Sequence, residues 1–250
     1  MNITLAILTN YSGGDIKKTI ASAQFCDDIL VFEDGDIKKL RPSNLPENTR
    51  FYSRLVNGDF ASQRNFAISK AQTDWILFLD DDEKLTSELA VEIQKVIKSD
   101  GPTVYRLRRR DFFWKTELKH GETALARSHG YIRLMKKGSS LWKGRVHETY
   151  ITEKKVGQLM GFINHYPHPT VTSFINSVNI YSTLRAEELW RQGKKSSTID
   201  LLFLPAGKFI YTYFFKFGFL DGPAGFMYSF MMSFHSFLVR AKLLQYEEIT

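Results

Sequence analysis

The stretch 75-WILFLDDDE-83 decides the fold. It begins with five apolar residues, 75–79, and ends with four consecutive acids. A short, unbroken apolar run is typical of a strand that is buried on both faces of a sheet. Carboxylates this close in the sequence repel one another unless a positive group lies among them. The stretch therefore predicts a buried strand that delivers acids to a site containing a positive group.

The acids have two interpretations. In the first they form an acidic helix start, where each carboxylate stabilises the helix by roughly 0.3–1 kcal/mol. The next helix is better begun at Thr86 or Ser87, however, so the acids precede it. In the second interpretation Asp80 and Asp82 form an Asp-x-Asp pair at a strand end, which suits Mg²⁺ or Mn²⁺ and leaves positions open for phosphate oxygens. We therefore expect a divalent metal site.

Residues 1–100 alternate between strand and helix patterns. Apolar runs at 3–8 and 29–32 read as further strands, and Asp15 can cap the first helix. This alternation implies an α/β fold with a mixed, mostly parallel sheet flanked by helices. Ligands bind beyond the carboxyl ends of the strands in such sheets. Polar clusters are expected at that edge: Thr9-Asn10, 33–36 and 80–83.

The remainder of the chain changes character. Residues 101–170 read as strands with alternating basic residues, and Ser173 is expected to cap a helix that runs to about Gln192. Residues 201–250 are rich in aromatic side chains, and 223–239 contain no charged one. We expect a helix pair here, either packed as a core or lying in a membrane interface, with a transmembrane helix as the weakest interpretation. Four basic residues would face anionic headgroups: Lys208, Lys216, Arg240 and Lys242.

Composition sets outer limits. A chain of 250 residues fits one sizeable domain, with or without an appendage. The net charge of +7 favours an anionic partner, but basic and aromatic residues lie mostly in separate segments, so no nucleic acid is expected. The one cysteine, Cys26, excludes an internal disulfide and favours a reducing compartment. The first residues lack a basic leader, so we expect no signal peptide.

Several motifs together resemble a known family. These are NGDFASQRNFAISKAQTDWILFLDDDE at 57–83, GRVHETY at 144–150, NHYPHPTVTSFINSVNIYSTLRAEEL at 164–189 and GFLDGPAGF at 218–226. Their order resembles family 2 glycosyltransferases of the GT-A fold, in particular bacterial lipopolysaccharide-core β-1,4-glucosyltransferases. The resemblance implies a catalytic domain at 1–170, with a nucleotide-sugar half at 1–100 and an acceptor half at 101–170. Residues 171–250 would form a helical, aromatic-rich extension.

The resemblance also implies donor and metal contacts. Nucleotide-sugar contacts fall on Thr9, Glu33, Arg64, Asn65, Asp80 and Asp81. Metal contacts fall on Asp82, Asp80 and His165, with Mn²⁺ or Mg²⁺ as the cofactor. Glu33 departs from the family, which usually has Asp there to read the uracil ring, and Asp36 stands where Ser is common. From the residues alone, an exposed helix face would explain Arg64 and Asn65, and a simple turn would explain 33–36.

Inverting transfer needs a carboxylate that takes the proton of the acceptor hydroxyl. Glu148 is the candidate base, and Asp111 is the alternative carboxylate. His120, Arg133 and His147 are candidate acceptor contacts. A basic set would suit a phosphorylated lipid-sugar acceptor, although charge that defends a strand edge explains part of it. Its members are Arg106, Arg108, Arg109, Arg110, Lys136, Lys137, Lys143 and Arg145.

The expected function is transfer of a hexose, glucose by resemblance, from a UDP-linked donor to a lipid-linked oligosaccharide of the lipopolysaccharide or lipooligosaccharide core. The expected location is the cytoplasmic face of the membrane, held peripherally on its anionic surface. Two alternatives remain open. One is a metal-dependent nucleotidyltransferase, for which the Gly13-Gly14 loop lacks the expected Thr-Arg sequence. The other is a non-catalytic, membrane-associated interaction protein, which the intact Asp-x-Asp pair disfavours.

Overall fold

The computed structural model describes residues 2–10, 14–35, 41–139, 141–144 and 148–249. The chain divides into two compact units, one of Met1–Arg110 with Leu125–Tyr166 and one of Asp111–Ala124 with Pro167–Thr250. This grouping differs from the predicted 1–170 and 171–250 in the segments 111–124 and 167–170. The physical reason for the first lies in Asp221, whose carboxylate accepts hydrogen bonds from the backbone N–H groups of Lys119 and His120.

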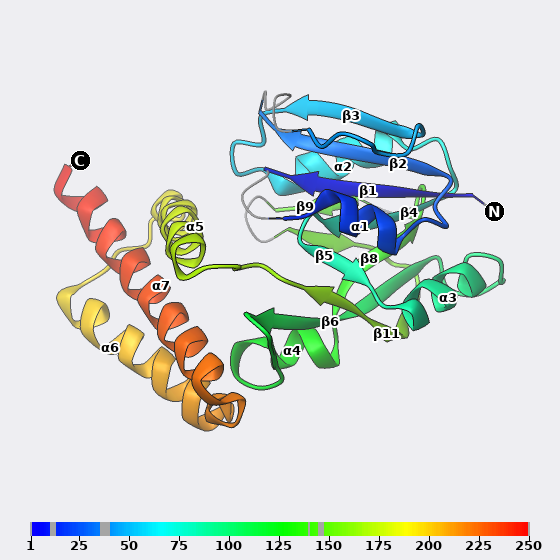
Figure 1. Cartoon of the computed structure of the whole chain (residues 1–250). Helices are drawn as coiled ribbons and strands as arrows, with labels where there is room; N and C mark the ends of the chain where they lie inside the picture. The colour runs from blue at the N-terminus through cyan, green and yellow to red at the C-terminus, as the bar shows by residue number, and fades with distance from the viewer. Residues whose placement is uncertain (1, 11–13, 36–40, 140, 145–147, 250) are drawn as a thin grey trace. The chain divides into compact units, whose positions relative to one another are not determined.

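Among the described residues, nine strands form one mixed sheet (Figure 1). They are β1 (Ile3–Thr9), β2 (Asp28–Asp34), β3 (Thr49–Arg54), β4 (Trp75–Asp80), β5 (Glu83–Leu85), β6 (Val104–Phe113), β7 (Thr116–Leu118), β8 (Tyr131–Lys136) and β11 (Val156–His165). The order across the sheet is β3-β2-β1-β4-β8-β6-β11-β5, and β7 pairs with β6. Two further strands, β9 (Leu141–Lys143) and β10 (Thr149–Ile151), pair antiparallel with each other.

The first four strands of that order are parallel, and they bring the predicted polar positions to one edge. Thr9 of β1 is in register with Glu33 of β2, and Leu8 of β1 is in register with Asp80 of β4. Beyond β4 the pairing with β8 is antiparallel. Because parallel strands end at the same edge, Thr9, Glu33 and Asp80 lie on the ligand-binding side of the sheet.

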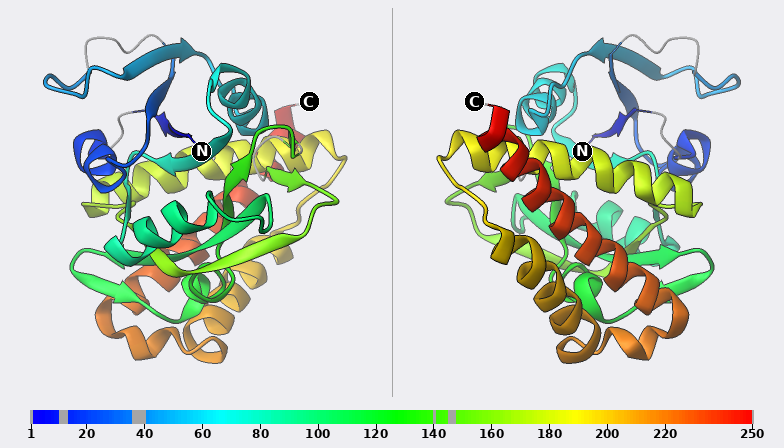
Figure 2. Two further views of the ribbon diagram at one scale, coloured as in Figure 1. Left: turned by 90° about the vertical axis from the view of Figure 1, so that its right-hand side faces the viewer. Right: turned by 90° about the vertical axis from the view of Figure 1, so that its left-hand side faces the viewer.

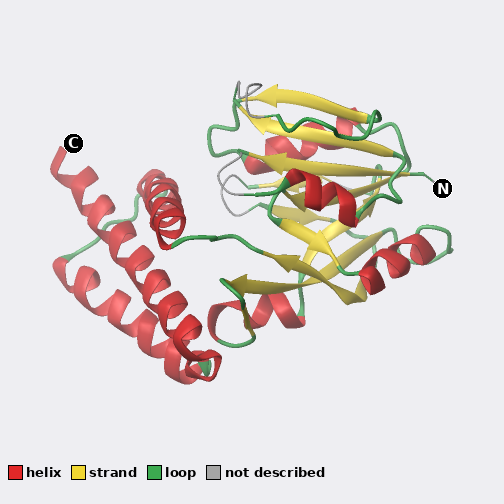
Figure 3. Cartoon of the chain, viewed as in Figure 1, coloured by secondary structure: helices red, strands yellow, loops and turns green. Residues whose placement is uncertain are grey.

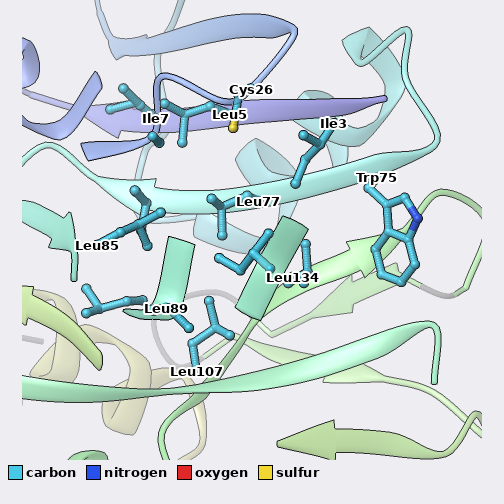
Figure 4. Packing of buried hydrophobic residues seen from close by; sticks show 14 of the residues in the cluster. Ile3, Leu5, Ile7, Cys26, Trp75, Leu77, Leu85, Leu89, Leu107 and Leu134 are labelled. Atoms are coloured by element: carbon cyan, nitrogen blue, oxygen red, sulfur yellow. The ribbon is translucent and has the colours of Figure 1, made fainter. Parts of the chain in front are cut away.

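Helices cover both faces of the parallel strands (Figure 3). The helices before β9 are α1 (Ile16–Ser22), α2 (Phe60–Lys70), α3 (Ser87–Val96), the 3₁₀ turn η2 (Gly121–Thr123) and α4 (Ala124–Ser128). Leu77 and Leu79 pack in a core with residues of α1 and α3, part of which Figure 4 shows. The alternate residues Ile76 and Phe78 pack in a second core with α2. The predicted strand that is buried on both faces is therefore present as β4.

Side-chain caps fix the helix starts. Asp15 caps α1 by accepting from the backbone N–H of Lys18, as predicted. Thr86 caps α3, so the acids do precede that helix. α5 (Val171–Arg191) begins earlier than predicted, because Thr170 is its cap and Ser173 completes a capping box as the third residue of the helix.

The second unit is built mainly from three helices. After α5 come α6 (Thr198–Ile210), the π-turn η3 (Tyr211–Phe215), the 3₁₀ turn η4 (Gly218–Asp221) and α7 (Gly222–Ile249). α6 and α7 run side by side in every view (Figures 1 and 2), and the Ser233 hydroxyl donates to the carbonyl of Pro205. Val178 and Met231 belong to the core between α5 and α7. The predicted fold class, a mixed sheet flanked by helices with a helical aromatic-rich C-terminal region, is confirmed.

Within the described ranges, none of the helices combines the length and apolar character needed to cross a bilayer.

Candidate active site

The acid run forms a tight turn between two strands. Asp80 ends β4, and Glu83 begins the short strand β5. β5 pairs antiparallel with β11, which puts Glu83 in register with His165. This turn lies at the carboxyl edge of the parallel strands, so the acids occupy the position where α/β sheets bind ligands.

Asp80 is held by two arginines. Nη2 of Arg133 donates to Oδ2 of Asp80 over 2.8 Å, and Nη2 of Arg64 lies 3.7 Å from Oδ1. Burial by itself would raise the pKa of the Asp80 carboxyl, but the two guanidinium groups outweigh it and hold the pKa below its ordinary value. Asp80 is therefore an ionised, firmly oriented carboxylate.

Glu83 is a buried partner of the same arginine, Arg133. Its side chain is fully buried, and Oε1 lies 3.0 Å from Nη2 of Arg133 and 3.5 Å from Nη1 of Arg109. Oε2 accepts the backbone N–H of Asp80 over 3.0 Å. Sequence reasoning gave Glu83 no role. The signal that could have found it is the strand alternation of Glu83-Lys84-Leu85, in which residues 83 and 85 face the same side. Three residues are too few to distinguish a strand from a turn.

Asp81 points its carboxylate toward the first strand. The Thr9 hydroxyl donates to Oδ2 of Asp81, and the Asp81 carbonyl accepts from the backbone of Asp15 and the hydroxyl of Thr19. Burial, with the charges of Asp82 and Asp80, raises the pKa of Asp81 to about 7 against the opposing hydrogen bond from Thr9. The two predicted nucleotide-sugar residues Thr9 and Asp81 thus bind each other.

Asp82 and His165 are the side chains that fit a divalent cation. Nε2 of His165 lies 3.4 Å from Oδ2 of Asp82. Oδ1 of Asp82 is buried without a hydrogen-bond partner among the described residues, whereas buried polar atoms normally have one. Carboxylate oxygens suit Mg²⁺ and Mn²⁺, whereas imidazole is the more usual ligand of Zn²⁺ or Fe²⁺. In the described part of the chain no three His, Cys, Asp or Glu side chains gather around one point.

Arg64 connects the acid turn to the predicted base. Its Nε donates to Oε1 of Glu148 over 2.9 Å, while its Nη2 faces Asp80. The guanidinium carbon lies 5.3 Å from the ring centre of Phe78 and 5.0 Å from that of Trp142, which keeps the side chain buried at 8% exposure. Glu148 and Asp80 therefore contact the same arginine, although the two acids are far apart in the sequence.

Asn65 fixes the strand pair near Glu148. Its amide nitrogen donates to the Trp142 carbonyl and its amide oxygen accepts the Trp142 N–H, both over 2.9 Å. Trp142 belongs to β9, whose partner β10 begins directly after Glu148. The structure thus places Asn65 on the backbone of β9, and its predicted contact with the nucleotide remains a prediction.

Glu33 lies at the predicted edge but is already engaged. Its fully buried carboxylate pairs with Arg41 through both oxygens and accepts from the Ser53 hydroxyl over 2.6 Å. The Arg41 guanidinium stacks 4.3 Å above the ring centre of Phe51. Any contact of Glu33 with a base would share this carboxylate with Arg41. Asp36 lies outside the described residues.

The predicted acceptor residues belong to different units of the chain. Arg133 is buried against Asp80 and Glu83 in the first unit. His120 belongs to the second unit, where Nδ1 lies 2.8 Å from Oδ1 of Asp221. The alternative carboxylate, Asp111, is buried in the second unit as well. His147 lies outside the described residues.

Part of the basic set surrounds one aromatic ring. The guanidinium carbons of Arg108 and Arg110 lie 4.2 Å and 3.9 Å from the ring centre of Phe162, and that of Arg127 lies 5.5 Å away. Arg127 was not part of the predicted set, because it comes from the short helix α4, whose position the sequence did not indicate.

Comparison with known proteins gives relatives of one kind. A lipopolysaccharide core biosynthesis glycosyltransferase, LpsC of Rhizobium meliloti, is 25% identical over 242 residues, which cover 92% of this chain and 87% of that protein. An uncharacterized glycosyltransferase of Rickettsia typhi is 28% identical over 194 residues, which cover 74% of this chain and 66% of that protein. The match thus spans slightly less than two thirds of the Rickettsia protein's length.

Two solved structures resemble the chain at low identity. The crystal structure of S. aureus TarS 1–349 in complex with UDP-GlcNAc has 10% identity and a TM-score of 0.46, with 100% of this chain and 93% of that chain covered. Glucosyl-3-phosphoglycerate synthase from Mycobacterium tuberculosis, in complex with Mn²⁺, UDP and phosphoglyceric acid, has 13% identity and a TM-score of 0.49, with 78% and 80% covered.

The family described as Glycosyl transferase family 2 matches residues 27–153, which is half of the chain. The matched range contains the acid run, Arg64, Arg133 and Glu148. The enzyme class predicted from the sequence, a glycosyltransferase, is thereby confirmed, and the chain belongs to glycosyl transferase family 2.

Proposed function

We propose that the protein is an inverting glycosyltransferase that moves a hexose, glucose in the first instance, from a UDP-linked donor to a sugar of the lipopolysaccharide or lipooligosaccharide core. The observation that carries the proposal is the bridge made by Arg64, which contacts both Glu148 and Asp80. It joins a candidate base to the carboxyl edge of the sheet, where the donor would bind. Family membership supports glycosyl transfer, and the name of the Rhizobium relative supports the acceptor class. The UDP-linked donor follows from the resemblance of the sequence motifs.

The residues divide the work of the reaction. Asp82 and His165 would hold Mn²⁺ or Mg²⁺, which when bound supplies positive charge that neutralises the leaving diphosphate. Asp80 is held in one orientation by Arg133, as a contact that orients the donor requires. The Glu148 carboxylate, fixed by Arg64 through Oε1, takes the proton of the acceptor hydroxyl as that oxygen attacks the anomeric carbon. Attack opposite the departing diphosphate inverts the configuration.

The acceptor class sets the proposed location. A core sugar attached to a lipid lies at the membrane surface, so the enzyme would work peripherally on the cytoplasmic face. The positive net charge of +7 favours contact with an anionic surface.

Donor binding tests the site. Titration calorimetry with UDP-glucose is expected to show binding that Mn²⁺ strengthens in the native protein and that Asp82→Ala weakens. Electron paramagnetic resonance of Mn²⁺ gives a second readout that does not depend on turnover. If the affinity for UDP-glucose changes neither with added Mn²⁺ nor in Asp82→Ala, the metal-assisted site is refuted.

Turnover tests the base. Glu148→Gln keeps the size of the side chain, so donor binding should survive while kcat falls by roughly 10²–10⁴-fold. The exposed Glu153 lies five residues away and gives the matched control, Glu153→Gln, which should keep the native kcat. Native turnover in Glu148→Gln would remove Glu148 as the base and leave Asp111 to be tested in the same way.

A further inference from the structure

The turn between α6 and α7 exposes a group of large apolar side chains. We call residues 211–220, which comprise η3 and the start of η4, the aromatic tip. Its exposed apolar members are Tyr211 (53%), Phe214 (54%), Phe215 (69%), Phe217 (56%), Phe219 (43%) and Leu220 (59%). Figure 2 shows the tip as the orange turn that joins the two helices. Contiguous exposed apolar surface of this kind marks an interaction site, whereas single exposed apolar residues need no explanation.

The apolar surface continues from the tip along α6. Phe203 and Leu202 of α6 are 69% and 62% exposed, and Ile199 at its first turn is 68% exposed. Pro205 is the buried residue of this helix, and its carbonyl accepts from Ser233 of α7. α6 therefore packs through a narrow stripe and presents most of its apolar side chains outward.

The segment around the tip carries few charges. Between positions 201 and 240 the charged residues are Lys208, Lys216, Asp221 and Arg240. The single acid, Asp221, has a 4% exposed side chain that is occupied by Lys119, His120 and the His120 ring. Lys208 pairs with Glu122, whose Oε1 lies 2.6 Å from its Nζ. The half-buried Lys216, whose Nζ lies 5.1 Å from the ring centre of Tyr211, is the charged residue of the tip itself and stands among the exposed rings. That combination complements an anionic lipid surface, where aromatic rings enter the headgroup region and lysines bind phosphate.

One residue of the tip has a left-handed backbone. Phe217 adopts φ of +59°, a left-handed conformation that bulky residues rarely adopt. Its N–H donates to the Phe214 carbonyl, and its carbonyl accepts from Leu220. Glycine would fit this conformation without strain, yet the position carries a phenylalanine that is more than half exposed. Strained backbone of this kind clusters at binding sites.

We propose that the aromatic tip, with the outer face of α6, inserts into the interface of an anionic bilayer and holds the enzyme at its membrane. The inference rests on the proposed function only for the choice of a lipid-linked acceptor. A second copy of the chain is the alternative occupant, and the concentration dependence described below tests for it. No spanning helix is required, since interfacial segments lie within one leaflet.

Vesicle flotation tests the proposal. The native protein should float with vesicles that contain phosphatidylglycerol and float less with phosphatidylcholine alone, and added salt should weaken the first binding. Burial of one large apolar side chain in the membrane raises the partition coefficient by roughly 10- to 100-fold. The triple variant Phe215→Ser, Phe217→Ser and Leu220→Ser should therefore lose about 100-fold or more of its vesicle affinity. The matched control is Leu55→Ser with Val91→Ser, which are 67% and 64% exposed in the first unit.

A second variant keeps the result interpretable if the triple variant folds poorly. Phe217→Gly relieves the left-handed strain, so it should preserve or raise the melting temperature while vesicle affinity falls by about tenfold. UDP-glucose binding by calorimetry should be unchanged in both variants, which separates failure at the tip from failure of the donor site. Native flotation of either folded variant, or a loss equal to that of the control, would overturn the proposal. So would a concentration-dependent dimer that the triple variant abolishes without any effect of lipid.

Discussion

Arg133→Met would leave two carboxylates without their shared cation. Nη2 of Arg133 lies 2.8 Å from Asp80 and 3.0 Å from Glu83, with the arginine side chain 6% exposed and Glu83 fully buried. Removing one partner of a buried ion pair costs about 3–5 kcal/mol, because an uncompensated charge stays behind. Arg109 remains 3.5 Å from Glu83 and is itself largely buried. We therefore expect the lower end, a loss of about 3 kcal/mol in the free energy of unfolding of the first unit.

Cys26 provides an assay that is specific to that unit. It is the one cysteine in the chain and lies buried in the core of β1, α1 and β2. A short pulse of thiol reagent at increasing urea concentrations labels only molecules in which this core has opened. With a urea dependence of about 1–3 kcal/mol per molar, a loss of about 3 kcal/mol should lower the labelling midpoint by about 1–3 M.

Two variants complete the measurement. Arg106→Met removes an exposed arginine of β6 and should leave the midpoint close to native. Adding Glu83→Gln to Arg133→Met removes one stranded charge and should restore part of the loss. If Arg133→Met unfolds at the same urea concentration as Arg106→Met while the KM for the acceptor rises, the ion-pair reasoning is refuted. Arg133 would then be the acceptor contact that the sequence predicts.

Two other predictions rest on close contacts, and a third rests on burial. In Gly14→Ala the new Cβ would lie 2.6 Å from the backbone carbon of Asp81, so the turn must shift and UDP-glucose affinity measured by calorimetry should fall at least about tenfold. Asn65→Ala removes both hydrogen bonds to the Trp142 backbone, which should lower the urea midpoint by a loss of about 1–3 kcal/mol and reduce kcat. Burial raises the pKa of the Cys26 thiol, so labelling without urea at pH 8 should be at least about 100-fold slower than in denaturant.

Each of these has a clear contrary outcome. Native donor affinity in Gly14→Ala would show that the loop before α1 does not constrain Asp81, with Gly138→Ala, which meets no neighbour, as the control for added strain. An Asn65→Ala protein with native stability but weak donor binding would favour the nucleotide contact that the resemblance implies. Rapid labelling of native Cys26 would show that the first core opens locally, and the urea assay would then need a different probe.

The sequence was sufficient for the frame of the site. Unbroken apolar runs predict β1, β2 and β4 as buried strands, and the polar residues that follow them meet at one edge because parallel strands end together. The cap at Thr86 follows from the preference of threonine for that position and separates the acids from the helix. These signals are local, because each depends on residues that are close together in the sequence. Burial of the apolar strands in the folded chain favours the same structure that the local signals predict.

The partners of the site residues could not be read in the same way. Arg133 and Glu83 are 50 positions apart, and Arg64 and Glu148 are 84 apart. From the sequence, Arg133 reads as a contact for the acceptor or as a charged residue at a sheet edge. Its contact with Asp80 follows only from the antiparallel pairing of β8 with β4. For the same reason Asn65 reads as an exposed polar residue, although its amide completes the backbone pairing of β9.

Charge balance explains why four adjacent acids are tolerated and why one of them stands apart. Asp80 and Glu83 share Arg133, with Arg64 and Arg109 as second partners. Burial moves the pKa of Asp81 to about 7, so part of its negative charge is absent near neutrality. Among the described residues Asp82 has no arginine partner, only His165, and one of its oxygens is buried without a hydrogen bond. The arginines thus neutralise Asp80 and Glu83 but leave the negative charge of Asp82 without an arginine partner. A cation in the proposed donor complex would relieve the repulsion between the Asp82 carboxylate and its acidic neighbours.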